Sequence, residues 1–68
     1  MSEAAAQAQA ALAEHGERGA VGQLVRAITA AVRAGDDAEV ARLDAVLQAV
    51  ELATEARARA LEAAAPVR

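Results

Sequence analysis

The sequence predicts an all-α protein, an antiparallel helical hairpin with a weaker N-terminal helix, and two chains are expected to pair in a four-helix, coiled-coil-like arrangement. Three observations favour this fold. Alanine fills 23 of the 68 positions, and the strong helix formers Leu, Arg, Gln and Glu fill another 24. Glycine occurs only at positions 16, 19, 22 and 35, so it divides the chain into three helical stretches. Large apolar residues recur with helical spacing in the last two stretches.

The first stretch covers residues 2–15, and residues 1–18 comprise this helix and a Gly-rich hinge. Ser2 is a good N-cap, and Glu3 places a negative charge in the first turn, where the helix dipole favours it. Leu12 is the one large apolar side chain of the stretch, so its apolar stripe is thin and built mostly of alanine. We therefore expect this helix to be weakly held on the rest of the chain.

The hairpin is predicted over residues 19–64, with helices at about 19–34 and 37–64 and a C-terminal tail at 65–68. The last helix carries a repeat with alternating spacings of three and four residues, which is the a/d pattern of a coiled coil. At about 1.5 Å per residue, this helix outruns the one before it by about 18 Å. That overhang needs cover, either from the N-terminal helix or from another chain.

The turn between the two hairpin helices carries clear stop and start signals. Arg33 lies in the last turn of the first helix, and Gly35 suits the left-handed position that follows a helix end. Asp36 is the predicted N-cap of the next helix, and Glu39, three residues on, completes a variant capping box. These adjacent signals predict a tight helical hairpin.

One apolar seam is predicted along the two hairpin helices, and it is the candidate interaction surface. In each helix its spacing follows one helical face. The apolar seam comprises Val21, Leu24, Val25, Ile28, Val32, Val40, Leu43, Leu47, Val50 and Leu61. Two arginines give residues 20–35 a net charge of +2, whereas six acids and one arginine give residues 36–55 a net charge of −5. The edges of two antiparallel helices with these charges can form ion pairs.

The composition excludes several classes of function. Without cysteine there is no disulfide framework and no thiol chemistry, and without aromatic residues there is no platform for base stacking. Without lysine there is no Schiff-base catalysis. A net charge of −3 argues against binding to nucleic acid or to an anionic membrane. No apolar run is long enough to span a membrane and the N-terminus does not resemble a signal peptide, so we expect a cytoplasmic protein.

Three groups of residues could carry chemistry, and each has a simpler structural interpretation. His15, the single histidine, could be a general base or a metal ligand, but it ends a helix, where a cation suits the dipole. The acids at positions 36, 37 and 39 lack the spacing of a calcium loop and suit helix capping. The GxxGxxG spacing of residues 16–22 follows no strand, so it indicates a turn or hinge. We expect no catalytic, cofactor-binding or metal site and no small-molecule substrate.

Two segments of the hairpin carry a resemblance to a known family. They are the turn at residues 32–39, Val-Arg-Ala-Gly-Asp-Asp-Ala-Glu, and the Ala-aliphatic-Glu element at residues 49–51. Over residues 20–62 the layout resembles the small E-type co-chaperones of type III secretion needle subunits, which form an antiparallel hairpin after a looser N-terminal segment. Those proteins tend to carry aromatic residues early in the second hairpin helix, and this chain has none. The resemblance implies binding to a second chaperone and a role in keeping an aggregation-prone needle subunit soluble.

The functional interpretation that these observations favour is a non-enzymatic helical protein-interaction module. It would act as a small co-chaperone or adaptor and bind another protein, or a second copy of itself, through an apolar helix face. The alternative is a small acidic regulatory protein, of the antitoxin or anti-activator type, that sequesters a partner. An enzyme or cofactor carrier is a third class, but no nucleophile or cofactor motif supports it. The sequence leaves open whether the N-terminal helix docks on the hairpin.

Overall fold

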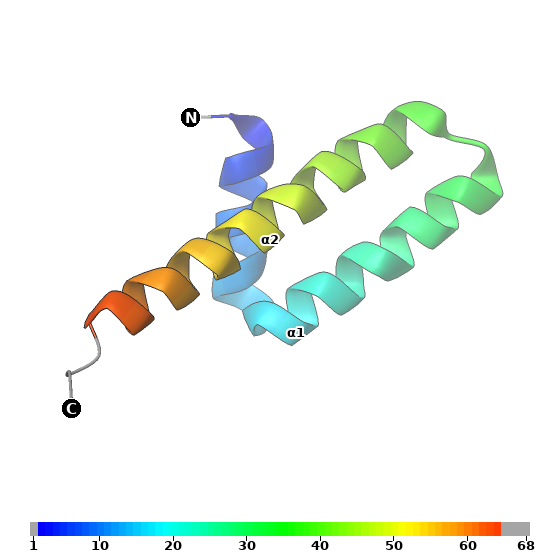
Figure 1. The fold of residues 1–68 in the computed structure, drawn as a ribbon. Helices are drawn as coiled ribbons and strands as arrows, with labels where there is room; N and C mark the ends of the chain where they lie inside the picture. Colours follow the sequence, from blue (N-terminus) through cyan, green and yellow to red (C-terminus); the bar gives the residue numbers. More distant parts are fainter. Residues whose placement is uncertain (1, 65–68) are drawn as a thin grey trace.

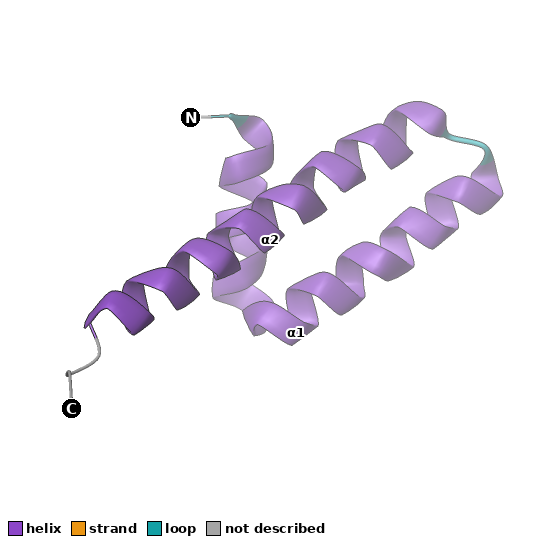
Figure 2. Cartoon of the chain, in the orientation of Figure 1, coloured by secondary structure: helices purple, strands orange, loops and turns teal. Residues whose placement is uncertain are grey.

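The computed structural model describes residues 2–64, which form two long helices joined by a tight turn (Figures 1 and 2). Helix α1 spans Glu3–Ala34 and helix α2 spans Asp37–Ala64. The second half of α1 runs antiparallel to α2 and packs beside it (Figure 1). The predicted all-α class and its helical hairpin are confirmed, and the predicted C-terminal tail lies outside the described residues.

Helix α1 bends sharply at Gly16 and therefore consists of two arms. Gly16 has φ 73° and ψ 177°, a combination that is essentially restricted to glycine. We call residues 3–15 the N-terminal arm and residues 17–34 the hairpin arm. The hairpin arm runs alongside α2, whereas the N-terminal arm crosses α2 (Figure 1). The Gly-rich segment predicted as a hinge bends at this one residue, and its other two glycines lie within helical turns.

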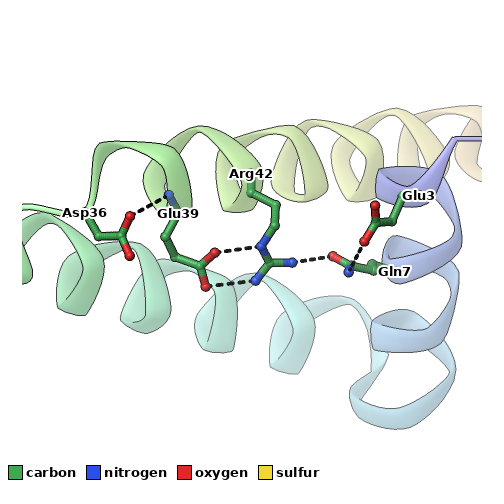
Figure 3. A network of polar contacts seen from close by, with 5 residues as sticks. All are labelled: Glu3, Gln7, Asp36, Glu39 and Arg42. Carbon is green, nitrogen blue, oxygen red and sulfur yellow. Dashed lines mark hydrogen bonds and ion pairs between the residues drawn. The ribbon is translucent and has the colours of Figure 1, made fainter.

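The hairpin turn consists of a helix-ending glycine and a capping aspartate. Gly35 adopts left-handed angles, φ 72° and ψ 22°, and its N–H donates to the carbonyls of Ala31 and Val32. The N–H of Asp36 also donates to the carbonyl of Ala31, at 3.0 Å, which completes a Schellman motif. The Oδ1 atom of Asp36 then accepts from the N–H of Glu39 at 3.1 Å and caps α2 (Figure 3). The predicted stop and start signals are confirmed.

The capping box predicted at this turn is only half formed. In a full box the carboxylate of Glu39 would accept from the N–H of Asp36, but that N–H donates to Ala31. The carboxylate of Glu39 instead accepts two hydrogen bonds from the guanidinium of Arg42, at 2.6 and 2.9 Å. A charged, bidentate donor binds a carboxylate more strongly than a single amide does. The prediction of the second half of the box is therefore wrong.

The core forms where the two arms of α1 meet α2. Its buried cluster consists of Ala8, Leu24, Ala31, Leu43, Val46 and Val50. Ala8, in the N-terminal arm, is only 1% exposed, and Val50 is completely buried. Alanine methyl groups let helices approach closely, although each buried methyl gains only on the order of 0.8 kcal/mol. The helix that the sequence suggested would be weakly held is therefore packed on the hairpin.

Helix α2 extends beyond the hairpin arm, so its last turns form an overhang. The N-terminal arm meets α2 just before this overhang, because Leu12 and Ala13 line a groove together with Ala53 and Thr54. Residues 55–64 are all exposed. In Figure 1 this end of α2, in orange, projects away from the other helical segments.

Candidate interaction surface

The structure distributes the ten residues of the apolar seam over three environments. Three are buried in the core: Leu24, Leu43 and Val50. Three are half-buried and pack against that core: Ile28, Val40 and Leu47. Four are exposed, by 37, 48, 60 and 64% respectively: Val21, Val25, Val32 and Leu61. The seam therefore does not form one continuous buried strip between the helices.

The core also includes residues that lie outside the predicted seam. They are Val46 and three alanines, Ala8, Ala20 and Ala31. The alanines were missed because a small apolar residue in a chain that is one-third alanine gives no contrast. The sequence does contain a signal that could have identified two of these alanines. Ala20, Leu24, Ala27 and Ala31 are separated by four, three and four residues, which places them on a second apolar stripe of the hairpin arm.

The hairpin arm thus carries two neighbouring apolar stripes with different environments. The alanine-rich stripe is turned towards the N-terminal arm, and Ala20, Leu24 and Ala27 line the groove between the two arms. The other stripe has the same 4-3-4 spacing but is mostly exposed: it consists of Val21, Val25, Ile28 and Val32. The smaller side chains are covered because they permit the close approach of the N-terminal arm.

Helix α2 is divided in a similar way. Three residues of α2 face the N-terminal arm. Arg42 donates a hydrogen bond to it, and Val46 and Ala53 each line a groove together with residues of that arm. Val40 and Leu47 lie roughly 100–120° around the helix from Val46, on the side away from that arm. We call the uncovered side of the hairpin the open apolar face. It comprises Val21, Val25, Ile28 and Val32 from α1, and Val40 and Leu47 from α2.

Charges of opposite sign flank the two edges of the open apolar face. On α1, Arg18 lies about 20° around the helix from Val25, whereas Arg26 and Arg33 each lie about 100° from the valine that precedes them, further round on the outer side of the helix. Beside Val40 and Leu47 of α2, the edge carries Asp37, Asp44 and Glu51. Between residues 2 and 64, each ion pair joins residues no more than four positions apart, and none includes these six residues. The predicted pairing of charges between the hairpin helices is therefore not formed in a single chain.

A polar network joins the N-terminal arm to the start of α2 (Figure 3). The guanidinium of Arg42, already bonded to Glu39, donates from Nη1 to Oε1 of Gln7 at 2.8 Å, and Gln7 donates to Glu3 at 3.4 Å. The hydrogen bonds from Arg42 hold the pKa of the Glu39 carboxyl below its ordinary value. The same contact raises the pKa of Arg42. The network therefore favours the charged form of both groups.

The residues that the sequence suggested for chemistry have ordinary structural surroundings. The Nε2 atom of His15 lies 3.9 Å from a carboxylate oxygen of its neighbour Glu14, on an exposed part of α1. Asp36 caps α2, and Asp37 lies in its first turn. Within the described part of the chain, no three His, Asp or Glu side chains are placed to hold one metal ion.

No protein family, curated protein or solved structure matches the chain. The antiparallel hairpin that the resemblance implied is present, but the comparisons identify no family. Neither described helix has a stretch of the length and hydropathy needed to cross a membrane.

Proposed function

We propose that this chain is a non-enzymatic helical module that works by binding protein through the open apolar face. The observation that carries the proposal is the exposure of large aliphatic side chains on one side of the hairpin. Val25 and Val32 leave 48% and 60% of their surface uncovered. Covering a side chain of this kind completely gains about 1.5–3 kcal/mol, so a partner on this face would gain from each one. Contiguous apolar surface with a polar rim is typical of protein-binding sites.

The charged residues near the hairpin turn make structural contacts. Asp36 is engaged in capping, and Glu39 and Arg42 bond to each other. Every side-chain polar atom that is buried in the described part of the chain has a hydrogen-bond partner.

Within this class, a small co-chaperone or adaptor is the function we favour. Its support is the short antiparallel hairpin, which is also the architecture that the resemblance to the needle-subunit co-chaperones implies. A protein of this kind would cover an apolar helix of its partner with the open apolar face. The docked N-terminal arm occupies the opposite face of the hairpin and leaves this one available.

Photo-crosslinking in the native cell tests whether the open apolar face binds protein. A photoreactive amino acid at position 32 should give covalent adducts with protein, because this position lies on that face. The matched control is position 52, since Leu52 is exposed to a similar extent, at 67% against 60% for Val32, but lies on the outer side of α2. If position 32 gives no more adduct than position 52, the proposal is wrong.

Circular dichroism of the isolated chain separates the two candidate classes. The adaptor proposal expects a helical signal that is already complete without a partner. A largely unfolded chain that gains helix only on binding the cross-linked partner would instead place the protein with regulators of the antitoxin or anti-activator type. That mechanism has a distinct signature, because folding is then coupled to binding.

A further inference from the structure

We propose that the open apolar face binds a second copy of this chain, in a dimer whose two-fold axis runs parallel to the hairpin helices. The inference rests on the proposed function and names the partner. The main argument for this dimer is the charge complementarity between the two edges of the open apolar face.

The two edges match in spacing as well as in sign. On the basic edge, Arg18, Arg26 and Arg33 are separated by eight and seven residues. On the acidic edge, three carboxylates are separated by seven and seven residues: Asp37, Asp44 and Glu51. Each edge therefore presents one charge about every two helical turns, or about 11 Å. None of the six is in an ion pair within the described part of the chain.

The tight turn aligns these charges at equal heights. Because the turn lies at Gly35 and Asp36, residues whose numbers sum to about 71 lie at the same distance from it. Position 33 is then level with position 38, position 26 with position 45, and position 18 with position 53. On the acidic edge, the residues nearest to these three levels are Asp37, Asp44 and Glu51 respectively. Each arginine therefore lies within two residues of the height of one carboxylate.

Two face-to-face arrangements with two-fold symmetry are possible, and they differ in the charges that meet. With the axis parallel to the helices, the hairpin arm of one copy lies over α2 of the other at the same height, so each basic edge meets an acidic edge. With the axis across the helices, the hairpin arms lie over each other and arginine meets arginine. Like charges at an interface are costly, so the first arrangement is favoured.

The same register also matches the apolar side chains. Val25 lies level with position 46 and therefore opposite Leu47 of the second copy, and Val32 lies opposite Val40 of the second copy. Two hairpins packed in this way form a four-helix bundle. The dimer would cover the valines of both copies while the N-terminal arms stay on the outer faces.

Sedimentation equilibrium of the purified full-length chain tests the dimer. We expect a species of twice the 6.9 kDa chain mass at micromolar concentration. Val25→Glu should make it monomeric, because the substitution puts two charges into the interface. Leu52→Glu is the matched control and should leave the dimer intact, since Leu52 is exposed on the outer side of α2. Circular dichroism of each variant establishes that the helices are retained.

A charge exchange tests the arrangement itself. Arg26→Glu should raise the dissociation constant by about tenfold, because two-fold symmetry breaks the pair twice. Asp44→Arg should do the same, and the double variant should recover most of the lost affinity. A dimer that the double variant does not recover, or that Val25→Glu leaves intact, would overturn the proposed interface.

A monomer at micromolar concentration would also overturn it. The protein-binding function would then still stand if position 32 forms adducts with a different protein in the cell, and it fails separately if position 32 forms no adducts. The failure of the dimer can therefore be distinguished from the failure of the protein-binding function.

Discussion

At the scale of single residues, Arg42 joins parts of the chain that are far apart in sequence. Its guanidinium bonds to Glu39 within α2 and to Gln7 in the N-terminal arm, 35 positions away. In the described part of the chain, the other side-chain hydrogen bonds span four positions or fewer. Glu39 already holds the guanidinium in place, so the entropic cost of fixing the long Arg42 side chain is shared between its contacts with Glu39 and Gln7.

Replacing Arg42 should loosen the N-terminal arm without unfolding the hairpin. We expect Arg42→Ala to speed hydrogen exchange of amides in residues 3–15 by about three- to tenfold, which is the effect of losing one hydrogen bond. The matched control is Arg59→Ala, because Arg59 also pairs with a glutamate one turn away but lies on the exposed overhang. Equal exchange rates of the arm in the two variants would contradict this role for Arg42.

At the scale of elements, the bend at Gly16 determines how α1 is used. A straight helix of 32 residues would be about 48 Å long and would carry the N-terminal arm away from the hairpin. The bend returns that arm across α2, so that Ala8 reaches the core. Glycine is needed at position 16 for its backbone conformation and not for lack of space. No atom lies within 4 Å of the place where a Cβ atom would be.

Substituting alanine at position 16 should therefore undock the arm. The strain of a side chain in this backbone conformation is about 1–3 kcal/mol, and the chain can relieve it by continuing the helix straight through position 16. We expect Gly16→Ala to lower stability by up to that amount and to raise the radius of gyration in small-angle scattering.

Gly22→Ala is the control for this prediction. Its φ is ordinary for a helix and the nearest atom to a new Cβ, at 3.8 Å, is the end of the Arg26 side chain. We expect it to stabilise the helix by up to about 1 kcal/mol, the difference in helix propensity between glycine and alanine. Identical scattering from the Gly16→Ala variant and the unsubstituted chain would refute the role assigned to the bend.

At the scale of the whole molecule, stability depends on a small core shared by three helical segments. Val50 is the largest completely buried side chain among residues 2–64, and the other members of the buried cluster are all alanine, valine or leucine. A domain of this size rarely has more than about 3–5 kcal/mol of stability. The loss of one large core side chain therefore removes a considerable share of the total.

Val50→Ala should lower the free energy of unfolding by about 2–3 kcal/mol. Two methyl-sized groups contribute roughly 0.8 kcal/mol each, and the cavity that remains adds to the cost. Leu52→Ala, two positions away but 67% exposed, should change stability by no more than about 0.5 kcal/mol. Urea unfolding followed by circular dichroism measures both, and a loss for Val50→Ala similar to that for Leu52→Ala would contradict the description of the core.

The sequence by itself determined what depends on neighbouring residues. The Ser2 and Asp36 caps, the left-handed Gly35 and the hairpin follow from contacts within about five positions, for which each residue type has a known preference. Helical spacing also placed Val25 and Val32 on one stripe, because the period alone determines which residues share a side of a helix.

Only the tertiary structure decided which apolar stripe is covered. Periodicity gives each stripe its direction around the helix, but it does not tell which stripe another segment will meet. That choice depends on the bend at Gly16 and on contacts between distant positions, such as Ala8 with the core and Gln7 with Arg42. Because methyl groups give little hydrophobic contrast but permit close packing, the alanine-rich stripe is the buried one and the valines stay exposed.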